Sequence, residues 1–188
     1  MKFTLVRHGE VEEPRPGLVE TGHDDPALTA FGRRQAAALA NQLMGPAEQD
    51  IQVDAIYTSP LRAARTTAEA LSAVLGAGDP RTASELTTLT PEVLADGDLS
   101  AVEAIQERAW RLILELKEQY DQRSTVVLVT HDLTIRSLVC KALEMPLAGM
   151  RRFHLDPASL TTIEFRLQRD RERILIAGLN DTCHIEAV

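Results

Sequence analysis

The stretch FTLVRHGE, residues Phe3–Glu10, decides how the rest of the chain is interpreted. Its first half, FTLV, is too short for a helix and predicts a strand that is buried on both faces. A cation, an imidazole and a glycine follow at once, in Arg7, His8 and Gly9. This combination at the end of a buried strand indicates a binding site for an anion such as phosphate, with a nucleophile or base beside it. The alternative is a strand-to-loop turn that carries two incidental polar residues.

Two further predicted strands run into polar residues in the same way. Residues 53–57 and 125–129 are predicted strands, and the second is an apolar run rich in β-branched side chains. The first leads into Ser59 and Arg62, and the second leads into His131. In open α/β sheets the ligand crevice lies beyond the carboxyl ends of the strands. Three separate segments therefore bring two histidines and at least two arginines to one edge, which favours a functional site over an incidental turn.

The order of the predicted elements indicates an α/β fold. Helices over about residues 29–44, 61–75 and 133–143 follow the three strands, and a long helix to about Tyr120 opens on the capping-box spacing of Ser100 and Glu103. A short helix is expected after Pro91, and residues 163–167 and 173–179 predict an antiparallel hairpin. We therefore expect a three-layer sandwich with a mostly parallel central sheet, helices on both faces and a C-terminal hairpin. Residues 1–188 are expected to form a single domain.

Composition narrows the choice of partners and of compartment. The net charge of −8 argues against nucleic acid or an anionic membrane as the main partner, whereas a local cluster of arginines can still hold a small anion. No stretch approaches the roughly 18 apolar residues of a membrane span, and the N-terminal run has no signal-peptide pattern. Cys140 and Cys183 form no CxxC or metal-ligand pattern and are expected to be reduced thiols. We therefore expect a cytoplasmic protein.

Five segments, taken in order, resemble the sequence signatures of the histidine phosphatase (phosphoglycerate mutase-like) superfamily. They are the RHGE run Arg7–Glu10; Leu28–Ala36, similar to the family's LTxxGxxQA helix; Tyr57–Leu61 with Thr67–Glu69, similar to SPLxRAxxTAE; Val129–Asp132 with Ile135 and Arg136, similar to the second-histidine motif; and Leu179–Thr182 with His184, similar to an NDTxH element of the phosphatase members. A lone RHG is a weak signal, but five elements in the right order over nearly the whole chain are a specific one.

The resemblance implies a site and a mechanism. His8 would attack phosphorus as the neutral imidazole and form a phosphohistidine, which water then hydrolyses. Arg7 and His131 would bind the equatorial oxygens of the phosphoryl group. Glu85, which lies where the family places its general acid, would protonate the leaving alkoxide and then take a proton from the attacking water. The scheme needs no metal and no cofactor.

One position departs from the family pattern. The family places a third phosphate-binding arginine four residues after the serine of its SPL motif, and here Ser59 plus four is Ala63. Arg62 stands one place early and is the expected substitute, through a one-residue adjustment of the turn after Pro60. Arg65 is a second, less favoured candidate. Without a third arginine the loss of one charge-assisted contact would cost about 2–4 kcal/mol of transition-state stabilisation.

Other assignments follow from the same resemblance. Thr21 and Gly22 lie in the loop where relatives contact substrate, and the alternative for them is an ordinary turn. Glu10 and Glu92 compete with the expected general acid. His184 is expected to make a structural hydrogen bond through its neighbours, with a place in the site as the second possibility.

The expected activity is metal-independent hydrolysis of a small phosphorylated substrate through phospho-His8. Alternatives within the same chemistry are phosphoglycerate mutase-type phosphoryl transfer and a protein phosphohistidine phosphatase. Ala63 suggests a low-activity protein that binds phosphorylated ligands, and a metal-dependent hydrolase could use His8, His131 and a carboxylate as ligands. Substrate choice is expected to come from residues 11–27 and 76–100, which carry no pattern that favours one substrate or one oligomeric state.

Overall fold

A computed structural model describes residues 1–12, 25–44, 52–88, 99–169 and 171–185. In chain order its elements are β1 (Lys2–Arg7), α1 (Ala30–Met44), β2 (Ala55–Thr58), α2 (Arg62–Leu75), β3 (Arg81–Thr82), the 3₁₀ helix η2 (Ser84–Leu86), α3 (Ser100–Gln119), β4 (Thr125–Thr130), α4 (Asp132–Ala142), the 3₁₀ helix η4 (Leu147–Arg152), β5 (Leu160–Gln168) and β6 (Arg171–Asp181).

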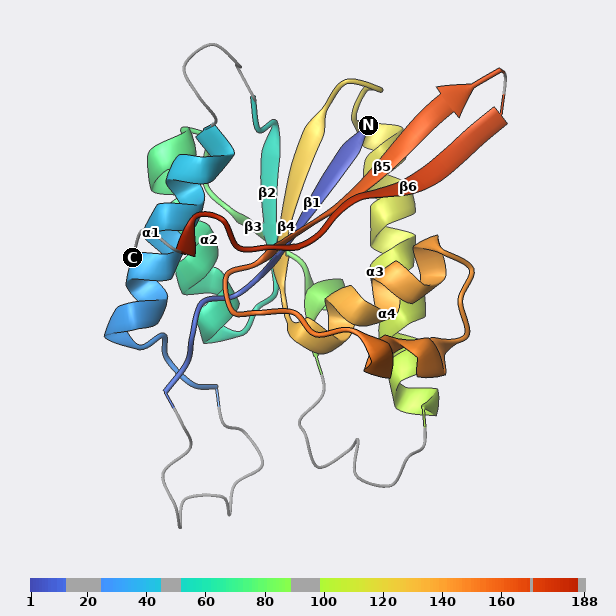
Figure 1. The fold of residues 1–188 in the computed structure, drawn as a ribbon. Coiled ribbons are helices and arrows are strands. Elements are labelled where there is room, and N and C mark those ends of the chain that lie inside the picture. Colours follow the sequence, from blue (N-terminus) through green and yellow to red (C-terminus); the bar gives the residue numbers. More distant parts are fainter. Residues whose placement is uncertain (13–24, 45–51, 89–98, 170, 186–188) are drawn as a thin grey trace.

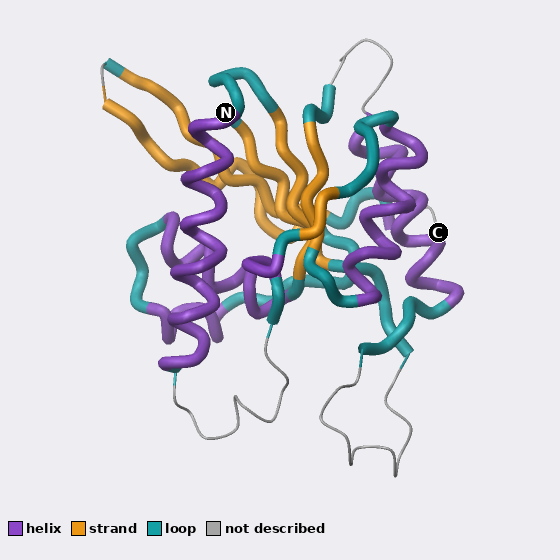
Figure 2. Tube along the Cα trace, turned by 180° about the vertical axis from the view of Figure 1, so that it is seen from behind, coloured by secondary structure: helices purple, strands orange, loops and turns teal. Residues whose placement is uncertain are grey.

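The strands form one six-stranded sheet in the order β3-β2-β4-β1-β5-β6. Strands β3, β2, β4 and β1 are parallel to one another, whereas β5 runs antiparallel to β1 and forms the expected antiparallel hairpin with β6. Helices α1 and α2 lie on one face of the sheet, and α3 and α4 lie on the other (Figure 1). The view from behind shows the same three layers (Figure 2). The expected fold class is therefore confirmed.

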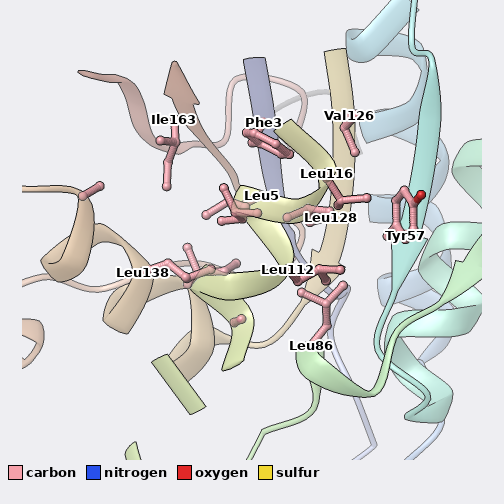
Figure 3. Close-up of a cluster of buried hydrophobic side chains, with 14 of the residues drawn as sticks. Phe3, Leu5, Tyr57, Leu86, Leu112, Leu116, Val126, Leu128, Leu138 and Ile163 are labelled. Atoms are coloured by element: carbon pink, nitrogen blue, oxygen red, sulfur yellow. The ribbon is translucent and has the colours of Figure 1, made fainter. Parts of the chain in front are cut away.

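Alternate residues of the central strands pack into two apolar cores. In β1, Phe3 and Leu5 point into the core beneath α3 and α4, and Val6 packs on the opposite face with residues of α1 and α2. The labelled side chains in Figure 3 show the first core, in which residues of β1, β2, β4 and β5 meet Leu112 and Leu116 of α3. All four residues from Phe3 to Val6 are buried, as expected for a strand covered on both faces.

The register brings the three strand ends to one edge. Arg7 pairs with Thr130 across β1 and β4, and Thr58 pairs with Val129 across β2 and β4. The residues that follow each strand therefore lie side by side, with the end of β4 between the other two. This juxtaposition builds the candidate site.

Local signals at the helix ends predicted some boundaries and missed others. Thr29 accepts a hydrogen bond from the backbone N–H of Gly32 at 2.9 Å, as expected for the residue that caps α1. Helix α3 begins at Ser100 and ends at Gln119, as predicted, but its N-cap residue is Leu99 and not Ser100. The helix expected after Pro91 lies outside the described residues. No helix among the described residues is long and apolar enough to cross a membrane.

Candidate active site

The backbone of β4 fixes the residues that follow β1 and β2. The N–H of His8 donates to the carbonyl of Thr130 at 3.1 Å, and the N–H of Ser59 donates to the carbonyl of Val129 at 2.9 Å. His131 follows Thr130 directly and is the N-cap residue of α4. Three chain segments thus deliver two histidines and a serine to one place; the strand ends had predicted the two histidines there, together with at least two arginines.

The loop after β1 packs backbone against backbone on the start of α1. A Cβ on Gly9 would lie 2.5 Å from the carbonyl oxygen of Gly32, and a Cβ on Gly32 would lie 2.1 Å from the carbonyl oxygen of Glu10. Both positions therefore require glycine for this close approach. The N–H of Gly9 donates to Thr67 of α2 at 3.2 Å, and the N–H of Glu10 donates to Gln35 of α1 at 2.9 Å. The backbone N–H groups of Gly9 and Glu10 are thus both bound by side chains of the two helices, α2 and α1, that cover one face of the sheet.

His8 is held as one tautomer of the neutral imidazole. Its Nδ1 lies 2.8 Å from the carbonyl oxygen of Gly9, and because a carbonyl only accepts, Nδ1 carries the proton. Burial lowers the pKa of His8; the bond to Gly9 opposes this and Arg7 adds to it. The second ring nitrogen, Nε2, therefore keeps its lone pair at neutral pH.

His131 stands against His8 and is more deeply buried. The ring centroids are 5.1 Å apart with an interplanar angle of 65°. The side chain is 6% exposed, and burial, His8 and Arg7 together lower the pKa of His131 to about 3. Its Nε2 lies 2.9 Å from Oγ of Ser59, a residue with no exposed surface. The hydroxyl of Ser59 also accepts the N–H of Leu61 at 3.3 Å, so its own proton is available to His131.

Arg7 presents a partly satisfied guanidinium beside the two histidines. Its Nη1 donates to the carbonyl of Leu155, and its backbone N–H donates to the carbonyl of Ser159 at 3.2 Å. Its Nε is buried and makes no hydrogen bond with any residue that the structure describes. Burial lowers the pKa of Arg7 from a very high ordinary value, and a guanidinium stays charged in proteins. A cation with an unused buried donor can bind an anion.

Glu85 lies in η2, which is tied to the ends of β2 and β4. The N–H of Ala83 donates to the carbonyl of Thr58 at 2.8 Å, and the hydroxyl of Thr130 donates to the carbonyl of Leu86 at 2.6 Å. These bonds hold the half-buried Glu85 near the strand end that carries His131. The competing Glu10 is exposed and accepts a hydrogen bond from the Thr29 hydroxyl at 2.8 Å, and Glu92 lies outside the described residues.

Within the described residues, no hydrogen bond or ion pair joins Arg62, the second-strand arginine, to the histidine cluster. Arg62 is the first residue of α2; its side chain is exposed and makes no hydrogen bond or ion pair with a described residue, while its backbone N–H donates to Asp25 at 2.7 Å. Ala63 is 3% exposed, and its carbonyl accepts the Thr67 hydroxyl at 2.8 Å. Because Thr67 also contacts Gly9, position 63 lies on the turn of α2 that faces the site. Thr21 and Gly22 lie outside the described residues.

Two site contacts were not predicted from the sequence. Ser59 was expected among the polar residues that follow the second strand, but its contact with His131 was not; its place at a strand end beside His131 brings the two side chains together. The carbonyl of Leu155 holds Arg7, and a backbone acceptor leaves no side-chain signal. His184 makes a structural hydrogen bond from Nε2 to the carbonyl of Ala158 at 3.0 Å, and its Nδ1 lies 3.1 Å from Oε1 of Gln42, so its partner is not one of the neighbours that were expected to supply it. Within the described ranges, no three His, Cys, Asp or Glu residues gather as metal ligands.

A histidine pair with an arginine, set at the carboxyl ends of a mostly parallel sheet, defines a phosphoryl-binding class of α/β enzyme. The sequence model of the histidine phosphatase superfamily (branch 1) matches residues 3–90 and 79–181. The chain belongs to this superfamily, and the expected family and enzyme class are confirmed.

Relatives with known names agree with this placement. The chain is 26% identical over 211 residues to phosphoserine phosphatase 1 of Hydrogenobacter thermophilus, covering 98% of this chain and 94% of the relative. It is also 26% identical to a 2,3-bisphosphoglycerate-dependent phosphoglycerate mutase of Thermoplasma acidophilum, covering 88% of each.

Solved structures share the fold. A phosphoserine phosphatase mutant from Entamoeba histolytica, in complex with phosphoserine, superposes with a TM-score of 0.76 at 24% identity, covering 97% of this chain and 98% of that one. A mycobacterial glucosyl-3-phosphoglycerate phosphatase superposes with a TM-score of 0.75 at 22% identity, covering 97% and 99%.

Proposed function

We propose that the protein hydrolyses small phosphate monoesters through a phosphohistidine on His8, without a metal or other cofactor. The observation that carries the proposal is the fixed tautomer of His8: Nδ1–H is bound to the Gly9 carbonyl, and the lone pair of Nε2 is free at neutral pH. A nucleophile must be unprotonated at the attacking atom, and the low pKa of the buried ring meets that need.

Two bond exchanges complete the reaction. In the first, Nε2 of His8 attacks phosphorus, the P–O bond to the leaving group breaks, and Glu85 gives its proton to the departing alkoxide. In the second, Glu85 takes a proton from water, the resulting hydroxide attacks phosphorus, and the P–N bond breaks to restore His8. One carboxyl group can serve both steps because the first leaves it as the base that the second requires.

Arg7 and His131 stabilise the charge on the transferred phosphoryl oxygens. Arg7 is held by Leu155 with a further buried donor unused, and the neutral ring of His131 can donate from Nδ1 while Ser59 occupies Nε2. Removing one such preorganised donor lowers kcat by about 10²–10³-fold in well-studied enzymes.

The relatives suggest the substrates to test first. Phosphoserine, phosphoglycerates and a glucosyl-3-phosphoglycerate carry a phosphate ester on a small polar molecule, so the proposed substrate is of this class.

Thr21 and Gly22 are proposed substrate contacts, and Arg62 remains the proposed third arginine. Ala63 predicts a slower enzyme than a family member with arginine at that position. A single domain and a cytoplasmic location remain predictions.

Phosphate release from a panel of these esters tests the proposal. The wild-type protein should release phosphate and, after brief incubation with labelled substrate, carry an acid-labile phosphoryl group. His8→Ala should lose both signals, and Glu85→Gln should retain labelling with a good leaving group while losing turnover of alkyl esters. Equal release by wild type and His8→Ala would refute the mechanism.

Chelation separates the proposal from the metal-dependent alternative. We expect EDTA to leave phosphate release unchanged and orthovanadate to inhibit it without added metal. A rate that falls with EDTA and returns with a divalent cation would favour the alternative.

A further inference from the structure

The C-terminal segment is tied by its side chains to a turn that touches the site. We define the anchor turn as Asp156–Ser159, which lies between η4 and β5 and closes with a hydrogen bond from the Ser159 N–H to the Asp156 carbonyl at 3.1 Å. We define the C-terminal clasp as Asn180 and His184, the first and last polar members of the NDTxH element.

The anchor turn and the residue before it hold His8, the proposed nucleophile, and Arg7, the proposed phosphate ligand. The N–H of Ala158 donates to the carbonyl of His8 at 3.0 Å, and the N–H of Arg7 donates to the carbonyl of Ser159 at 3.2 Å. The guanidinium of Arg7 donates to the carbonyl of Leu155, immediately before the turn. A displacement of this turn would therefore move the backbone of His8 and the only side-chain anchor that the described residues provide for Arg7.

The turn holds an unfavourable conformation of its own. Ala158 has φ +60°, in the left-handed region that residues with a Cβ disfavour, and Pro157 precedes it in the arrangement typical of a type II turn. A strained backbone persists only where its surroundings enforce it. The bonds to His8 and to the C-terminal clasp are the polar contacts that can do so.

Asn180 makes two hydrogen bonds to Asp156 at the start of the anchor turn, one through each polar atom of its side-chain amide. Its Oδ1 accepts the N–H of Asp156 at 2.7 Å, and its Nδ2 donates to Oδ2 of Asp156 at 2.7 Å. This bond is the main reason that the pKa of Asp156 is lowered. Asn180 itself has φ +53°, which asparagine tolerates better than other residues with a Cβ.

His184 grips the end of the turn. Its Nε2 donates to the carbonyl of Ala158 at 3.0 Å, and its Nδ1 lies 3.1 Å from Gln42 of α1. Gln42 also donates to Asp181 at 3.1 Å. The ring therefore lies between the anchor turn and α1, is held by its hydrogen bond to Ala158, and is buried.

We propose that the C-terminal clasp positions Arg7 and His8 for phosphoryl transfer by holding the anchor turn. The inference rests on the proposed function, because it assigns roles to Asn180 and His184 in the same site. Neither contacts the proposed nucleophile or its arginine, so each acts as a positioning residue. The clasp should matter more for the transition state than for the bound substrate, since a misdirected guanidinium can still attract a phosphate but stabilises the transferring group less well.

Steady-state kinetics on three clasp variants and one control variant test the proposal. Asn180→Gly keeps the left-handed backbone and removes the amide; we expect kcat to fall about 10–100-fold and KM to change less than about threefold. His184→Ala should behave in the same way, and His184→Gln should recover most of the rate, because its amide can donate to Ala158 from nearly the same place. Leu179→Ala, in the same strand and outside the clasp, is the matched control and should keep the wild-type rate.

Ligand affinity supplies the readout that a general loss of stability would not produce. Orthovanadate, which mimics the transition state, should bind Asn180→Gly about tenfold or more weakly, and inorganic phosphate should bind with nearly unchanged affinity. Equal weakening of both ligands, or wild-type kcat in the two clasp variants, would overturn the proposal while leaving the proposed hydrolysis intact.

A third measurement judges the clasp if the wild-type protein releases no phosphate. Hydrogen exchange at Nε–H of Arg7, followed by NMR, reports the order of the guanidinium without any turnover. We expect exchange to be at least about tenfold faster in Asn180→Gly than in wild type and Leu179→Ala. Unchanged exchange in Asn180→Gly would refute the clasp independently of the activity.

Discussion

Acidification should destabilise the folded protein through His131 alone by an amount that can be worked out. The pKa of this buried imidazole falls from an ordinary 6.5 to about 3, chiefly because burial removes water from the charged form. The unfolded chain binds a proton as the pH drops below 6.5, and the folded protein does not until about pH 3. Stability contributed by the neutral ring is therefore fully present above 6.5 and is lost progressively as the pH falls.

The magnitude at about pH 5 follows from the unfolded state. This pH is about 1.5 units below the ordinary pKa, and each unit corresponds to about 1.4 kcal/mol, so the free energy of unfolding should fall by about 2 kcal/mol between pH 8 and pH 5. The result is the same for any folded pKa well below 5. Burial lowers the pKa of His8 as well, which adds a further loss of the same sign.

Urea unfolding of wild type and His131→Gln at the two pH values isolates the effect. Glutamine can still accept the Ser59 hydroxyl but binds no proton, so the variant should lose about 2 kcal/mol less than wild type on acidification. The contribution of His8 and of the surface groups is common to both proteins and cancels in the comparison. An equal loss in the two proteins would show that His131 is not held neutral by burial.

Three further substitutions probe the site. Gly9→Ala places a Cβ 2.5 Å from a backbone oxygen, so we expect a loss of about 1–3 kcal/mol in urea unfolding together with a fall in kcat/KM, whereas Gly178→Ala, with no atom within 4 Å of its Cβ, should stay within about 0.5 kcal/mol of wild type. Ser59→Ala leaves Nε2 of His131 without its partner and should cost about 1–3 kcal/mol, with a change in the histidine tautomer seen by ¹⁵N NMR; an unchanged tautomer would contradict the assignment. Thr130→Val removes the 2.6 Å bond that holds η2 and should lower kcat about tenfold with KM unchanged. A rise in KM with an unchanged kcat would argue against Glu85 as the general acid.

Much of the fold could be predicted because most of its strands are short apolar runs that can be recognised from the local sequence. The runs at residues 3–6 and 125–129 are apolar and short, which is the signature of strands covered on both faces, and both proved to be buried. Strand β3 was missed because two exposed residues, Arg81 and Thr82, carry no periodicity. The order of strands also lay beyond local pattern, since β4 enters between β1 and β2 through pairings that are distant in sequence.

The candidate site likewise has residues that a local segment predicts and contacts that depend on pairings distant in sequence. His8, Arg7 and His131 were predicted from strand ends and motif resemblance; the structure sets the two histidine rings against each other, and Arg7 is close enough to lower the pKa of both. The contact from Ser59 to His131 depends on the register of β2 against β4, which no single segment encodes. The N-cap residue of α3, Leu99 in place of Ser100, has a similar cause, because a capping-box spacing is a local preference that tertiary packing can override.

The position of β1 in the sheet has a consequence for synthesis of the protein. Its two neighbours, β4 and β5, are Thr125–Thr130 and Leu160–Gln168, so a growing chain carries β1 without a hydrogen-bonding partner until most of its residues have left the ribosome. For that time Phe3–Val6 is an unpaired apolar segment of the kind that chaperones bind and that aggregates when exposed. A chain cut short before β4 therefore lacks both the sheet around β1 and the histidine that faces His8, and we expect such a fragment to aggregate rather than to keep weak activity.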